Sequence, residues 1–141
     1  MTRTRRGTKA APAAVVVDSH FWVEYFSHKK NKAVAEIERL LRRDVVRIAE
    51  PVRYELLTGA RTTGERAYLA GVLRALPSLD TTETVWAETV SLAVEGKAHL
   101  NRVPLSDVLI AAHCCVHGCS LRTRDPHFDV FPRLARHAFP D

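Results

Sequence analysis

The pattern of apolar and polar positions changes period repeatedly along the chain. Apolar runs at residues 13–17, 45–49, 79–81 and 119–123 predict short strands, and the β-branched first run is typical of a strand buried on both faces. The segments between them repeat apolar residues at helical spacing, and we expect helices at residues 20–27, 31–43, 51–58, 63–76, 83–99 and 105–117. Strands that alternate with helices predict the α/β class with a parallel sheet.

Glycine and proline mark several of the expected boundaries. Pro51 suits the first turn of a helix, and Gly118 suits the position just after the apolar helix at 105–117. The segment after Asp125 contains Pro126, Pro132 and Pro140, so we expect it to be rich in loops.

Composition fits a single globular domain, since the chain has 141 residues, of which 46% are hydrophobic and 26% charged. We expect residues 1–12 to form a flexible basic N-terminal tail and residues 13–141 to form the domain. The formal net charge is +5. Four of these charges belong to the tail residues Arg3, Arg5, Arg6 and Lys9, so the body is nearly neutral and net charge alone does not identify a nucleic-acid surface.

Cysteine usage indicates a reducing compartment, which we take to be the cytoplasm. Cys114, Cys115 and Cys119 are odd in number and too closely spaced for a disulfide framework. No apolar run reaches the roughly 18 residues that a membrane-spanning helix needs, so we expect no membrane association. The apolar N-terminal run contains Pro12 and ends at Asp18, which argues against a signal peptide.

Four acidic residues stand where chemistry is expected. Asp18 directly follows the first strand, and Asp125 follows the 119–123 strand after one residue. Ligands of parallel α/β sheets bind beyond the carboxyl ends of the strands. Glu55 and Asp107 lie on helices that are otherwise apolar. Several carboxylates near a core repel one another, and Mg²⁺ or Mn²⁺ would relieve this repulsion by binding their oxygen atoms.

Each acid also has a purely structural explanation. Asp18 can cap a helix, Asp107 can favour the first turn of its helix, and Asp125 can start a turn. Glu55 can pair on the surface with Arg53 or Arg61. The metal hypothesis therefore depends on all four carboxylates meeting at one place.

Four segments that contain these acids resemble, in order, the motifs of PIN-domain ribonucleases, especially the VapC-type toxins. They are VVVDSHFWVEYF at 15–26, PVRYELLTGA at 51–60, PLSDVLIAA at 104–112 and LRTRDPHF at 121–128. The resemblance extends from about residue 13 to residue 131. Each motif alone is weak, whereas four in order at suitable spacing are fairly specific.

The resemblance implies a fold, an activity and partners. The fold would be a PIN-like three-layer α/β/α sandwich whose central, mainly parallel sheet has four or five strands. The activity would be that of a Mg²⁺- or Mn²⁺-dependent endoribonuclease, the toxin of a type II toxin–antitoxin system, which cleaves RNA phosphodiesters with metal-activated water. Asp18, Glu55, Asp107 and Asp125 would be catalytic and metal-binding, supported by Ser19 and Thr123. The partners would be an RNA substrate, a cognate VapB-like antitoxin and a second copy of the chain.

Two other functions remain open at this stage. One is a catalytically silent PIN-like module that binds RNA or an antitoxin. The other is a phospho-acceptor domain, which usually has an adjacent acid pair after its first strand, whereas Asp18 has no acidic neighbour.

Three other chemical features near these motifs carry less weight. Asp129 is a spare acid near the fourth motif, and we favour Asp125 as the ligand. A lone loop histidine such as His127 usually has no function. A zinc site at His113 and His117 is disfavoured, because the helix should end between the neighbouring cysteines.

Overall fold

The computed structural model describes residues 14–137, so the predicted basic tail at residues 1–12 lies outside the described residues. Within that range, four strands form one sheet: β1 (Val15–Val17), β2 (Val46–Arg47), β3 (Ser120–Arg122) and β4 (Arg136–His137). The strand order is β2-β1-β3-β4, and every pairing is parallel. The fold is therefore a three-layer α/β/α sandwich, which confirms the predicted class.

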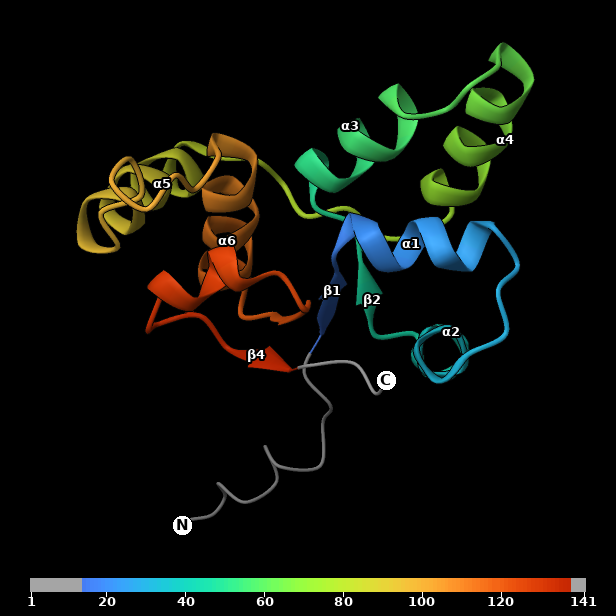
Figure 1. Ribbon diagram of the computed structural model, residues 1–141, viewed down its shortest axis with the longest axis horizontal. Coiled ribbons are helices and arrows are strands. Elements are labelled where there is room, and N and C mark those ends of the chain that lie inside the picture. Colours follow the sequence, from blue (N-terminus) through green and yellow to red (C-terminus); the bar gives the residue numbers. More distant parts are fainter. Residues whose placement is uncertain (1–13, 138–141) are drawn as a thin grey trace, which may run out of the picture.

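The described part of the chain contains six α-helices: α1 (Ser19–Phe26), α2 (Lys32–Arg42), α3 (Glu50–Thr58), α4 (Thr63–Arg74), α5 (Glu83–Glu95) and α6 (Leu105–His117). In Figure 1, α5 and α6 lie on one side of the strands and α1 and α2 on the other, while α3 and α4 lie together beyond the end of the sheet where α1 begins. A short 3₁₀ helix, η2 (Pro126–Val130), connects β3 to β4.

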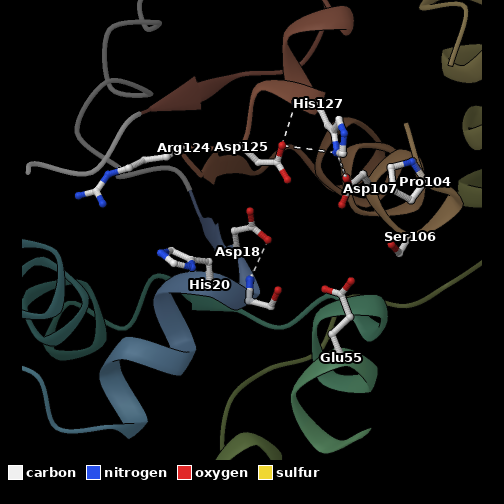
Figure 2. Close-up of a pocket in the computed structure, with 10 residues that line it drawn as sticks. Asp18, His20, Glu55, Pro104, Ser106, Asp107, Arg124, Asp125 and His127 are labelled. Carbon is white, nitrogen blue, oxygen red and sulfur yellow. Dashed lines mark hydrogen bonds and ion pairs between the residues drawn. The ribbon is translucent and has the colours of Figure 1, made fainter. Parts of the chain in front are cut away.

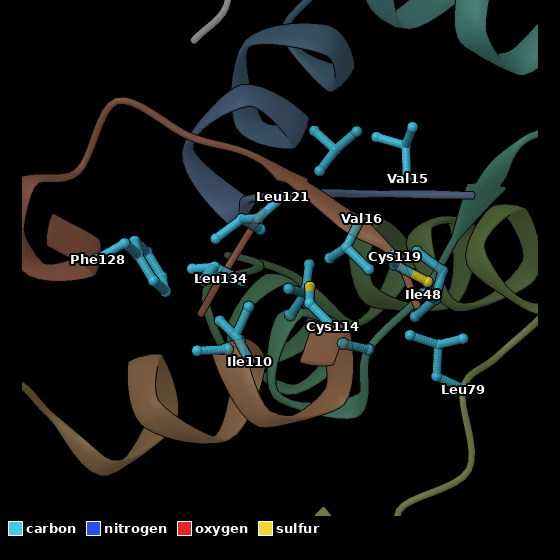
Figure 3. Close-up of a cluster of buried hydrophobic side chains, with 14 of the residues drawn as sticks. Val15, Val16, Ile48, Leu79, Ile110, Cys114, Cys119, Leu121, Phe128 and Leu134 are labelled. Atoms are coloured by element: carbon cyan, nitrogen blue, oxygen red, sulfur yellow. The ribbon is translucent and has the colours of Figure 1, made fainter. Parts of the chain in front are cut away.

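The core lies between the sheet and its helices. All three residues of β1 are buried, as the unbroken valine run predicted. Ile110 and Cys114 of α6 face the strands, next to the buried Leu121 of β3 and Phe128 of η2 (Figure 3). The parallel pairing of β1 with β3, in which Val17 lies opposite Arg122, places the carboxyl ends of the two strands side by side.

Helix ends follow the local chemistry of the sequence. The side chains of Asn31, Thr62 and Thr82 accept a backbone N–H at the start of α2, α4 and α5. Gly118 ends α6 in the left-handed conformation, with φ of 69°. Most expected helices therefore begin and end within two residues of their predicted limits.

Three details of the fold differ from prediction. Residues 79–81 form no strand; Ser78 makes a single bridge to Ile48 instead. Helix α5 ends at Glu95 rather than His99, because the chain turns after Gly96. The C-terminal segment contains η2 and β4, which were not predicted because its prolines indicated loops.

Candidate metal-binding site

Asp18 stands at the junction between β1 and α1, where the chain leaves the sheet. Its Oδ1 accepts the backbone N–H of Ser19 at 2.8 Å, and its Oδ2 accepts the hydroxyl of Thr123 at 2.7 Å. Burial raises the pKa of this carboxyl above its usual value, and the charge of Asp125 raises it further. The two hydrogen bonds lower the pKa and so oppose both effects. Asp18 is thus both a helix cap and a buried acid held in one orientation.

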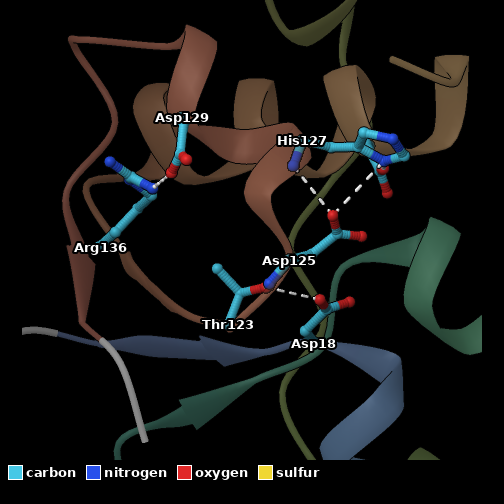
Figure 4. A network of polar contacts seen from close by, with 7 residues as sticks. Asp18, Thr123, Asp125, His127, Asp129 and Arg136 are labelled. Carbon is cyan, nitrogen blue, oxygen red and sulfur yellow. Dashed lines mark hydrogen bonds and ion pairs between the residues drawn. The ribbon is translucent and has the colours of Figure 1, made fainter. Parts of the chain in front are cut away.

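Asp125 follows β3 and begins η2. Its Oδ1 accepts the backbone N–H of His127 at 2.9 Å, and its own N–H donates to Thr123 Oγ1 at 3.0 Å. Thr123 therefore connects Asp18 and Asp125 across the adjacent ends of β1 and β3, as Figure 4 shows. This is the supporting role that the resemblance implied for Thr123, whereas Ser19 supports Asp18 through its backbone.

Asp107 lies in the first turn of α6 and is only 8% exposed. Its Oδ2 lies 2.9 Å from Nδ1 of His127. Burial is the main cause that raises the pKa of Asp107 to about 6; the charges of Asp125 and Asp18 add to it, and the contact with His127 opposes it. The carboxylates of three separate motifs therefore influence one another electrostatically.

Glu55 extends from α3 toward the other three acids (Figure 2). Surface pairing does not explain it, because Arg53 binds Glu50 instead, at 3.1 Å. Within residues 14–137, no hydrogen bond or ion pair joins Glu55 to Arg61 either.

One cavity of about 470 Å³ brings the four acids together at the carboxyl ends of the strands. Its lining residues are Asp18, Ser19, His20, Glu55, Pro104, Ser106, Asp107, Arg124, Asp125 and His127. The four acids come from the β1–α1 junction, α3, α6 and the β3–η2 connection, so the fold collects residues that lie far apart in sequence. Asp129 does not line this cavity; its carboxylate binds Arg136 at 2.5 Å.

The donor atoms of this cavity suit a hard divalent cation. Single ligand atoms from Asp107, Asp125 and His127 lie within 4.8 Å of one another, while Asp18 and Glu55 line the same space outside that group. Burial is the main cause of the raised pKa values of Asp18 and Asp107, and the negative charges of neighbouring carboxylates add to it. A divalent cation bound by carboxylate oxygens would relieve that charge.

His127 is the residue of this cluster that sequence reasoning missed. Its position two residues after Asp125 is a weak indication that the two side chains lie close together. An aspartate side chain often accepts the backbone N–H two residues further on, which forms a tight turn. The disfavoured zinc site gains no support from the structure. His113 is fully buried, and its two ring nitrogens already contact Thr81 Oγ1 at 2.8 Å and the carbonyl oxygen of Leu109 at 2.7 Å.

Comparison with known proteins adds the family. The family model described as "PIN domain" matches residues 15–134. The chain belongs to the PIN domain family. Two curated relatives are the VapC ribonuclease Mb1587 of Mycobacterium bovis and ribonuclease VapC11 of Mycobacterium tuberculosis. Each is 33% identical over 125 residues, which cover 85% of this chain and 92% of the relative.

Solved structures agree with this PIN fold. The chain resembles VapBC2 from Rickettsia felis bound to a promoter DNA fragment, with a TM-score of 0.74 and 16% identity over 90% of this chain and 99% of that one. It also resembles a toxin–antitoxin complex from Klebsiella pneumoniae, with a TM-score of 0.71 and 20% identity over 86% and 96% of the two chains. At these identities the likeness supports the fold.

Proposed function

We propose that this PIN domain is a metal-dependent endoribonuclease and the toxin of a type II toxin–antitoxin system. The observation that carries the proposal is the meeting of four carboxylates in one cavity at the carboxyl ends of parallel strands. The names of the curated relatives, which are ribonucleases, supply the substrate class.

Asp18, Glu55, Asp107 and Asp125 would hold the ion, which we propose to be Mg²⁺ or Mn²⁺. Such an ion activates water and neutralises charge on a phosphodiester during its hydrolysis. The chain itself supplies fixed oxygen donors: Thr123 orients Asp18, and the turn at η2 orients Asp125. Preset ligands lower the reorganisation needed during reaction.

The rim of the cavity suits an RNA backbone. Arg124 and His20 line the same space as the acids, and both side chains can donate hydrogen bonds to phosphate oxygens. The cysteines offer no competing nucleophile, since none of the three lines the cavity, and Cys114 and Cys119 are buried. Burial raises the pKa of both thiols, which disfavours the reactive thiolate.

A cognate VapB-like antitoxin and a second copy of the chain are the proposed protein partners. Support for the antitoxin comes from the structural neighbours, which include toxin–antitoxin complexes. Helix α5 leaves Trp86, Val90 and Val94 exposed, an apolar stripe suited to protein contacts. We place the protein in the cytoplasm, which its three free cysteines favour. No helix within residues 14–137 is long and apolar enough to cross a membrane.

Cleavage of a total-RNA pool by the purified protein tests the proposal. Wild type in Mg²⁺ or Mn²⁺ should cut RNA, and both EDTA and Asp18→Asn should abolish cleavage. Asp129→Asn is the matched control, because Asp129 is a nearby acid outside the cavity and should be dispensable. Cleavage that survives Asp18→Asn would come from a contaminant. Folded, partner-free protein that cuts none of several RNAs would favour a silent binding module instead.

A further inference from the structure

His127 places a ring nitrogen between two of the carboxylates. Nδ1 lies 2.9 Å from Asp107 Oδ2 and 3.5 Å from Asp125 Oδ1 (Figure 4). Within residues 14–137, these three side chains form the group whose donor atoms are close enough to share one ion. Ligands on opposite sides of an ion such as Mg²⁺ are separated by about 4 Å, which is close to the spread of this group.

The imidazole ring is not needed to build the local fold. The backbone N–H of His127, rather than its ring, caps Asp125 and starts η2. The ring remains 40% exposed, so it adds little to the core, which Phe128 fills from the next position. With its proton on Nε2, the neutral ring would present the Nδ1 lone pair to the space between the two carboxylates.

We propose that His127 is a nitrogen ligand of the divalent ion and biases the site toward Mn²⁺ over Mg²⁺. The inference rests on the proposed function, because it requires an ion at the carboxylate cluster. Mg²⁺ is bound almost entirely by oxygen, whereas imidazole suits transition metals. Asp107, Asp125 and His127 then form a mixed oxygen and nitrogen donor set, and Asp18 and Glu55 complete the carboxylate wall of the cavity.

Metal binding measured without RNA tests the inference directly. Pulsed electron paramagnetic resonance of bound Mn²⁺ detects coupling to a ligand ¹⁴N nucleus. The coupling should appear in wild type, vanish in His127→Ala and His127→Gln, and persist in His20→Ala. His20 is the matched control, since it lines the same cavity but pairs with Glu24 on α1 at 3.1 Å.

Calorimetric titration with Mn²⁺ and with Mg²⁺ gives the second readout. Both His127 variants should lose at least about tenfold in Mn²⁺ affinity and much less in Mg²⁺ affinity, so the preference for Mn²⁺ falls. Using two variants keeps the test valid if the alanine variant fails to fold.

Two results would overturn the inference, and they have different meanings. Wild type that binds both ions without nitrogen coupling, and whose ion preference survives in His127→Gln, makes His127 only a hydrogen-bond partner of Asp107. That outcome leaves the nuclease proposal intact. Wild type that binds neither ion overturns the inference together with the metal-dependent function.

Discussion

Replacing Asp107 by Asn should stabilise the metal-free protein at neutral pH. The carboxylate is buried in the first turn of α6 and close to Asp125 and Asp18, and its pKa is raised from 3.8 to about 6. An acid whose pKa is higher in the folded than in the unfolded state destabilises the fold once it ionises. The cost grows as pH rises from about 4 to about 6 and is complete above that range.

The size of the effect follows from the same values. A pKa difference of about 2 corresponds to about 3 kcal/mol of unfolding free energy at pH 7.5. Asn keeps an oxygen that can face His127 but carries no charge, so Asp107→Asn should recover about 1–3 kcal/mol. In a domain of this size that raises Tm by about 3–9 °C.

Thermal unfolding followed by circular dichroism in EDTA measures this gain. It should be largest at pH 7.5, and about two thirds of it should disappear at pH 4.5, where the folded wild type is mostly protonated. Asp129→Asn is the control, because Asp129 is exposed and paired with Arg136, and it should show no gain. Added Mn²⁺ should raise the Tm of wild type more than that of Asp107→Asn. An Asp107→Asn protein that is less stable than wild type at pH 7.5 would refute the argument that burial and neighbouring charges make the ionised carboxylate destabilising.

Three further substitutions test separate parts of the structure. Thr123→Val removes the hydroxyl that donates to Asp18 and accepts from Asp125, so the free energy of unfolding measured in urea should fall by about 1–3 kcal/mol. Thr123→Ser keeps the hydroxyl, so an equal fall in that variant would contradict this reason. In Gly118→Ala the added Cβ meets no atom within 4 Å, but the residue must keep its φ of 69°, so the free energy of unfolding should fall by about 1 kcal/mol in the same urea experiment. An unchanged unfolding midpoint would show that the backbone relaxes. Glu55→Gln should lower RNA cleavage at least about tenfold while Tm stays nearly constant, because the side chain is only half-buried; a large fall in Tm would indicate a structural role.

The sequence predicted the meeting of the four acids better than it predicted the edges of the fold. Asp18 and Asp125 were predicted to lie near each other because each follows a strand, and parallel strands end at the same edge of a sheet. Strand β4 was not predicted because Arg136 and His137 are both exposed and show no alternation of apolar and polar residues. A two-residue edge strand is fixed by its backbone pairing to β3, which leaves no trace in side-chain pattern.

Tertiary contacts decided the remaining features. His127 was set aside as a lone loop histidine, because the sequence alone does not give the direction of its side chain. That direction depends on the turn that Asp125 caps and on the position of Asp107 on α6. The apolar residues of α5 predicted a helix correctly but not its orientation, since Trp86 and Val90 are exposed while Leu92 is buried. An apolar pattern identifies a helix, whereas contacts with the rest of the domain determine which of its faces is covered.

The hydrogen bond between Thr123 and Asp18 spans 105 residues, which has a consequence for synthesis of the chain. At about 5–20 residues per second, Asp18 is made roughly 5–20 s before its partner. During that interval β1 lacks β3, and neither Asp125 nor His127 exists to complete the cavity. A nascent chain therefore cannot assemble the four-acid cavity until residue 127 has been made.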